Sequence, residues 1–196
     1  LPGLINTHTH FGMTLFRGTA DDRDLQGFLA AVWPLETAFV TADTVRLGVS
    51  IAIAESLQAG VTTAADMFFY PETSTQVAEQ LGFRLIAGPT LINGLTVEHP
   101  DFDTALAAAR TWLAEHEPGL GLRTTICPHS SYTLTEPQLL RVAALGAEFD
   151  ALVQIHAAEN GGEMDLVRDQ HGATPIEVMQ RTGILEGNVL LAHAVH

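Results

Sequence analysis

Four short apolar runs in this chain each end in histidine. The histidines that close these runs are His8 (with His10 two residues later), His129, His156 and His193. Side chains at the C-terminal ends of parallel barrel strands converge on one mouth, and neutral imidazole is the commonest metal ligand in proteins. The pattern therefore favours a fold that brings distant strand ends together, and it predicts a metal site where they meet.

Strand-like runs alternate with segments of helical spacing along the chain. We expect strands at Leu4–His8, Val61–Met67, Arg84–Thr90, Leu122–Cys127, Ala151–His156 and Val189–His193. We expect helices at Asp43–Ala59, from Thr73 to Gly82, at Asp103–Glu117, from Thr135 to Gly146 and from Thr174 to Gly183. This order is typical of right-handed βαβ units on a parallel sheet. No Gly-rich turn follows the first strand, which argues against a doubly wound sheet and favours an α/β barrel.

Two of the expected helices have well-marked ends. Thr135 with Gln138, and Thr174 with Glu177, have the spacing of a capping box. Gly146 and Gly183 are expected to end the two helices in a left-handed conformation.

Charge and cysteine content exclude several classes of partner. The formal net charge is −14, and such a surface repels nucleic acid and anionic membranes. No apolar run reaches the roughly 18 residues that a membrane span requires. Cys127 is the only cysteine, which fits a reducing cytoplasm and excludes Cys-rich zinc sites. The expected partner is a small molecule.

His8 and His10 are two residues apart, so on a strand both side chains point to one face and can reach one ion. A solvated strand face with two polar residues is the alternative. The neighbouring Leu4 and Ile5 argue for a buried strand, where histidines need partners. We therefore favour the ligand interpretation.

His156 ends an apolar run, and Glu159 lies just past that strand end. The alternative for His156 is a core histidine bonded to a backbone carbonyl. A carboxylate at position 159 could reach water on a bound ion, which favours a site. His129 and His193 have the same strand-end placement.

Five motifs together resemble the amidohydrolase superfamily, and most of all its heterocycle deaminase and chlorohydrolase branch. That branch includes S-adenosylhomocysteine and methylthioadenosine deaminases, guanine deaminases and triazine hydrolases. The motifs occupy residues 2–10, 60–63, 128–130, 156–159 and 192–196, in the expected order. The resemblance implies a (β/α)8 TIM-type barrel, of which about six of the eight βα units are counted here.

The resemblance also implies residue roles. His8, His10 and His156 would hold one divalent ion, with zinc expected and Fe²⁺ or Mn²⁺ as alternatives. Glu159 would shuttle the proton between the attacking water and the leaving group. His193 would hydrogen-bond the attacking hydroxide or the substrate.

Two further residues would bind the substrate. His129 would contact the substrate ring, and Glu36 would hold ring nitrogens, with an ordinary solvated glutamate as the alternative. Binuclear members of the superfamily bridge two metals with a carbamylated lysine. The chain contains no lysine, so a single-metal site is expected.

The implied activity is hydrolytic deamination of a purine, pterin or similar nitrogen heterocycle, with release of ammonia. Glu36 favours this over a chlorohydrolase or N-alkylaminohydrolase of triazine-like rings. A non-catalytic metal-binding fragment is the remaining alternative. Residues 1–196 are expected to form an incomplete catalytic barrel domain, without the last two strands, their catalytic aspartate and a small flanking β domain, so this segment alone is expected to be impaired. Asp66 is not assigned as a substitute for that catalytic aspartate. Self-association is expected only because relatives in this branch are often oligomers.

Overall fold

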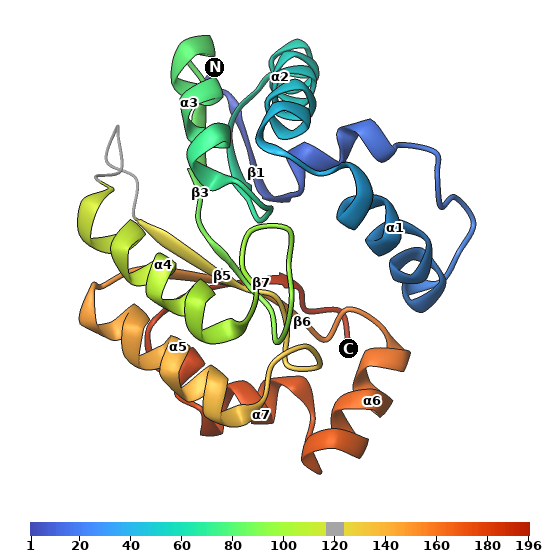
Figure 1. Ribbon diagram of the computed structural model, residues 1–196, viewed down its shortest axis with the longest axis vertical. Coiled ribbons are helices and arrows are strands. Elements are labelled where there is room, and N and C mark those ends of the chain that lie inside the picture. The colour runs from blue at the N-terminus through green and yellow to red at the C-terminus, as the bar shows by residue number, and fades with distance from the viewer. Residues whose placement is uncertain (117–123) are drawn as a thin grey trace.

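The computed structural model describes residues 1–116 and 124–196, which form seven parallel-paired strands with helices between them (Figure 1). The strands are β1 (Leu4–Thr9), β2 (Val61–Asp66), β3 (Arg84–Ala87), β4 (Thr90–Leu91), β5 (Thr125–Pro128), β6 (Leu152–Ala157) and β7 (Asn188–His193). The α-helices are α1 (Leu25–Phe39), α2 (Ala42–Gln58), α3 (Pro71–Leu81), α4 (Phe102–Glu115), α5 (Glu136–Glu148), α6 (Gly161–His171) and α7 (Pro175–Arg181). Two 3₁₀ helices are η1 (Phe11–Phe16) and η3 (Ile184–Glu186).

The strands follow one another in chain order, in two sheets. One sheet has the order β1-β2-β3 and the other β4-β5-β6-β7. The run expected as one strand at Arg84–Thr90 is broken at Gly88 and Pro89, so β3 pairs with β2 while β4 pairs with β5. Proline cannot donate to a ladder, but the Pro89 carbonyl accepts the Cys127 N–H at 2.9 Å. The two sheets therefore continue each other as six successive strand positions, as expected for part of a barrel.

Gly88 lies where two strand backbones approach closely. A Cβ at this position would lie 2.0 Å from the Thr125 carbonyl oxygen, and backbone cannot give way cheaply. We expect Gly88→Ala to lower the free energy of unfolding by about 1–3 kcal/mol, measured by urea denaturation. Gly187→Ala is the control, because nothing lies within 4 Å of a Cβ there. Equal urea midpoints for the two variants would contradict the conclusion that position 88 requires glycine because two backbones approach closely there.

Helices cover the outer face of the strands in two groups (Figure 1). Helices α2 and α3 pack with β2 and β3, and α4 and α5 pack with β4, β5 and β6. Each group has its own apolar core, the first including Val49 and Ile53 and the second including Leu139, Ile155 and Met179. Each group of helices thus packs on its strands through a separate apolar core.

The five expected helices are confirmed as α2, α3, α4, α5 and α7. Helices α1 and α6 were not expected, because Pro34 lies inside α1 and Gly161 and Gly162 begin α6. Both residue types disfavour helix. The available signals were the N-caps Asp24 and Asn160, whose side chains accept first-turn N–H groups at 2.8 and 2.9 Å.

The expected stop at Gly146 is wrong. Helix α5 continues to Glu148, and Gly146 is buried where a Cβ would lie 3.0 Å from a Val153 methyl group. This glycine permits close packing of α5 on β6. Gly183 does follow α7 in a left-handed conformation, with φ of 78°. Two parts of the expected ranges, residue 117 and residues 122–123, lie outside the described residues.

The expectation of a buried first strand is also wrong at its start. Leu4 and Ile5 are 63% and 68% exposed, because β1 pairs only with β2 among the described strands. The half-buried state of His8 and His10 therefore comes from their place at the other end of β1.

No helix within the described ranges combines the length and apolarity needed to cross a bilayer.

Candidate active site and metal centre

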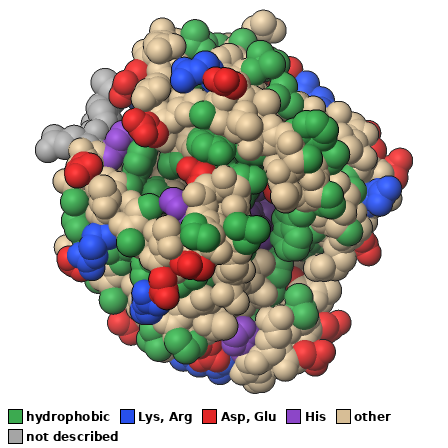
Figure 2. All heavy atoms as spheres, in the orientation of Figure 1, with side chains coloured by type: hydrophobic (Ala, Val, Ile, Leu, Met, Phe, Trp, Pro, Cys, Tyr) green, Lys and Arg blue, Asp and Glu red, His purple; other side chains and the backbone are tan. Residues whose placement is uncertain are grey.

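The strand ends open into a cavity of about 590 Å³. It is lined by all seven residues to which a role is assigned from the sequence: His8, His10, Glu36, His129, His156, Glu159 and His193. Figure 2 shows histidine side chains set among hydrophobic ones in the middle of this face, with most Asp, Glu and Arg side chains toward its periphery. The expected convergence of distant strand ends is confirmed.

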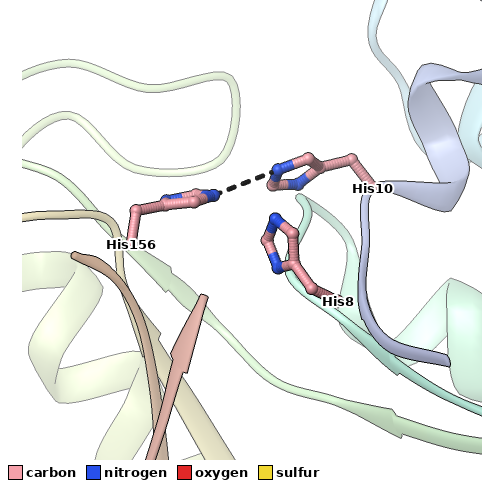
Figure 3. A group of neighbouring side chains, drawn as sticks. All are labelled: His8, His10 and His156. Carbon is pink, nitrogen blue, oxygen red and sulfur yellow. Dashed lines mark hydrogen bonds between the residues drawn. The ribbon is translucent and has the colours of Figure 1, made fainter. Parts of the chain in front are cut away.

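Three histidines offer ligand atoms to one point. Nitrogens of His8, His10 and His156 lie within 4.8 Å of one another. Figure 3 shows His8 and His10 approaching from β1 and the residues after it, and His156 approaching from β6 on the opposite side. His8 and His10 lie on the same side of the site, as their spacing predicts. The third donor, His156, is 146 residues from His10 along the chain.

The hydrogen bonds of two of these rings fix which nitrogen is free. His10 Nδ1 bonds the Met67 carbonyl, and His156 Nδ1 bonds the His129 carbonyl at 2.8 Å. A carbonyl can only accept, so each Nδ1 carries the proton and each neutral ring has a lone pair on Nε2. The two Nε2 atoms lie 3.2 Å apart. Two facing lone pairs repel, and this donor set therefore fits a divalent cation.

Burial keeps the rings uncharged at neutral pH. Desolvation, with His10 and His193 adding to it, lowers the pKa of His8 to about 4. Desolvation followed by the charge of His10 lowers the pKa of His129 to about 3. The pKa values of His10 and His156 are lowered by burial as well. Neutral imidazole is the form that binds metal.

Glu159 and His193 form a pair beside the three histidines. His193 Nε2 lies 3.7 Å from a Glu159 carboxylate oxygen. Burial raises the pKa of Glu159, which the charge of His193 opposes and that of Glu163 reinforces. His193 ends β7 with φ of 72°, a strained conformation of the kind found at functional sites. Both residues line the cavity, where the Glu159 carboxyl group can exchange a proton with a ligand.

Glu36 reaches the cavity from α1. Leu29, Val32 and Glu36 are all buried, and their spacing places them on one helix face. Burial raises the pKa of Glu36 to about 7. Within residues 1–116 and 124–196 its carboxyl group has no side-chain hydrogen bond, so it is free for a ligand. The alternative of a solvated glutamate is wrong.

His129 presents its other nitrogen to the same space. Its Nδ1 lies 3.1 Å from both the Ser130 and the Thr133 hydroxyl oxygen, and Nε2 has no partner in the described part of the chain. The ring lies edge-on to Tyr132, with centroids 5.6 Å apart. His129 is thus oriented by the loop after β5.

The carboxylate of Asp66 is occupied by hydrogen bonds from the end of β1 and the residues that follow it. Its carboxylate accepts the Phe11 N–H at 2.7 Å and the Thr9 hydroxyl at 3.0 Å. Burial raises its pKa to about 6. Asp66 therefore has a structural role and is not part of the candidate site.

Sequence reasoning missed several cavity residues. Arg23, Phe68 and Tyr132 line the cavity, and Glu163 is buried just behind Glu159. Arg23 and Tyr132 lie in loops without a recognisable pattern. The spacing of Asn160 and Glu163 as a helix start was the signal that could have identified Glu163.

Residues 1–196 match the sequence profile of the Amidohydrolase family. The 5-methylthioadenosine/S-adenosylhomocysteine deaminase of Thermodesulfovibrio yellowstonii is 34% identical over 196 residues, covering 100% of this chain and 45% of that protein. The 5'-deoxyadenosine deaminase of Methanopyrus kandleri is 36% identical over 197 residues, with coverage of 100% and 45%.

A similar solved structure is that of an adenosine deaminase from Xanthomonas campestris with bound zinc. Its TM-score is 0.92 at 32% identity, and the match covers 98% of this chain and 44% of that one. The chain thus spans a little under half the length of the relatives it matches. The profile match over residues 1–196 and the shared fold show that this chain belongs to the Amidohydrolase family.

Proposed function

We propose that the protein carrying this chain is a metal-dependent hydrolytic deaminase of a purine-like heterocycle. The single observation that carries the proposal is one cavity holding a three-histidine donor set, the Glu159–His193 pair and the buried Glu36. The deaminase names of relatives at 34% and 36% identity support the same reaction class.

His8, His10 and His156 would hold the ion, and we propose zinc because a zinc-bound deaminase shares the fold. When bound, such an ion supplies hydroxide at neutral pH by lowering the pKa of its water from about 15.7 to roughly 7. Nδ1 bonds to Met67 and His129 hold two of the rings in the required orientation.

Glu159 moves the proton, and His193 supports the reaction beside it. Attack forms a C–O bond at the ring carbon that bears the amino group. Glu159 takes the proton of the attacking water and returns it to the amino nitrogen, so that the C–N bond breaks with loss of ammonia. A raised pKa suits Glu159 to both steps. His193, 3.7 Å away, stabilises charge that develops at the attacked centre.

Glu36 and His129 orient the ring. With a pKa of about 7, Glu36 is able to donate a hydrogen bond to a ring nitrogen in its protonated form. The free Nε2 of His129 contacts the substrate ring. This arrangement selects flat nitrogen heterocycles with an exocyclic amino group.

The test is an ammonia-release assay on protein expressed from its complete reading frame and loaded with zinc. The panel contains adenosine, 5'-deoxyadenosine, methylthioadenosine, S-adenosylhomocysteine, guanine and a pterin. We expect release from at least one adenine nucleoside, lost on chelation and restored by zinc. Silence across the panel, with chloride or alkylamine released from a triazine, would overturn the proposal in favour of the triazine alternative.

A further inference from the structure

We propose that Glu163 is a positioning residue that clamps the turn at Ala158 and so directs Glu159 toward His193. The inference rests on the proposed role of Glu159 and extends it to a residue that never touches the substrate.

Glu163 is a carboxylate without a cation. It is 0% exposed, and no basic side chain of the described residues forms an ion pair with it. Burying such a group is costly unless its oxygens are hydrogen-bonded. Both are: one accepts the Glu159 N–H at 2.6 Å and the other the Ala158 N–H at 3.3 Å. The N-terminus of α6 adds a favourable dipole.

Ala158 is held in a conformation that it does not favour. Its φ is 50°, in the left-handed region that suits glycine. On its carbonyl side, the Ala158 oxygen accepts N–H groups from Val195 and His196 at 3.0 and 3.1 Å. One residue therefore links the turn that carries Glu159 to the segment that follows His193. Glu163 supplies the bonds on the N–H side.

Ordinary helix capping does not explain this arrangement. In a capping box the residue at the third helical position bonds the N–H of its own N-cap residue. Glu177 in α7 does so, since it accepts the Thr174 N–H at 2.8 Å. Glu163 occupies the same position in α6, where Asn160 is the N-cap. It reaches past Asn160 to the two preceding residues, which include the proposed proton carrier.

This comparison supplies matched variants, Glu163→Gln and Glu177→Gln. Each exchanges a carboxylate for an amide at the third position of a helix, but Glu177 is exposed and bonds its own N-cap residue, whereas Glu163 is buried and bonds Ala158 and Glu159. In E163Q one backbone N–H loses its acceptor and faces an NH₂ group. We expect hydrogen exchange at Ala158 and Glu159 to become about 10-fold faster in E163Q, as for one lost hydrogen bond, and to stay unchanged in E177Q.

In the zinc-loaded protein we expect kcat of E163Q to fall about 10- to 100-fold, with KM and metal content unchanged, because the proton carrier is misplaced. E177Q keeps wild-type kinetics. Adding Ala158→Gly to E163Q is expected to recover part of kcat, because glycine adopts this φ freely. If E163Q is too unstable to purify, the kinetic measurements are made on the double variant instead.

Three results would overturn the inference: exchange at Ala158 and Glu159 that matches E177Q, a rise in KM without loss of kcat, or no gain from A158G. Inactive wild type and E177Q would instead remove the proposed deaminase activity. The exchange measurement would still decide whether Glu163 clamps the turn.

Discussion

Replacing His156 with asparagine is expected to abolish tight metal binding and to lower kcat/KM on the order of 10³-fold or more, because hydroxide is no longer generated at neutral pH. The asparagine NH₂ can take the place of Nδ1 and still donate to the His129 carbonyl. Nothing replaces Nε2, which faces His10 Nε2 at 3.2 Å. The substitution therefore deletes one ligand atom and leaves its supporting bond.

Elemental analysis after dialysis, combined with ammonia release, provides the measurement. His116→Asn is the matched control, because this histidine stacks on Trp112, with ring centroids 3.9 Å apart, and does not line the cavity. We expect H116N to retain about one equivalent of metal per chain. If H156N retains as much metal as H116N, the three-histidine donor set is wrong. The same analysis distinguishes zinc from iron and manganese.

Replacing Glu159 with glutamine is expected to lower kcat by about 10²- to 10⁴-fold, the usual contribution of a positioned acid–base group. The amide keeps the size of the side chain but cannot take and return a proton. Metal content is expected to stay at the wild-type level, because Glu159 does not belong to the donor set. Single-turnover ammonia release measures the chemical step directly.

Two outcomes would contradict this role for Glu159. Loss of metal in E159Q would make the residue a ligand, and kcat within a factor of about three of E177Q would leave proton transfer to another group. His193 is the neighbouring candidate, at 3.7 Å from the carboxylate. Glu159→His is a further test, and we expect it to recover part of the kcat lost in E159Q because an imidazole can also take and return a proton.

The positions of the strands and of the clustered histidines could be predicted from the sequence. Apolar runs of five to seven residues define the strands, and parallel pairing makes their C-terminal ends meet. Residues as distant as His10 and His156 could thus be assigned to one cavity before any coordinates, and the cavity confirms this. Their metal-binding and catalytic roles, like self-association, stay predictions.

Features that depend on tertiary packing could not be predicted. Leu4 looks like a core residue, but its exposure depends on what lies beside β1. Gly146 has the sequence signature of a helix stop, yet closeness to Val153 decides its role. Glu163 fits a helix cap, and only the left-handed turn at Ala158 shows that its carboxylate bonds elsewhere.

The break at Gly88 and Pro89 separates the donors of the histidine cluster. His8 and His10 belong to the β1 side of the break, and His156 belongs to the β6 side. An ion bound by all three would act as a cross-link between the two sheets, so its binding free energy would add to the cohesion of the barrel segment. Chelation should then loosen the contact between the two sheets at Gly88 as well as stop the proposed reaction, so the lifetime of the folded protein would depend on metal supply.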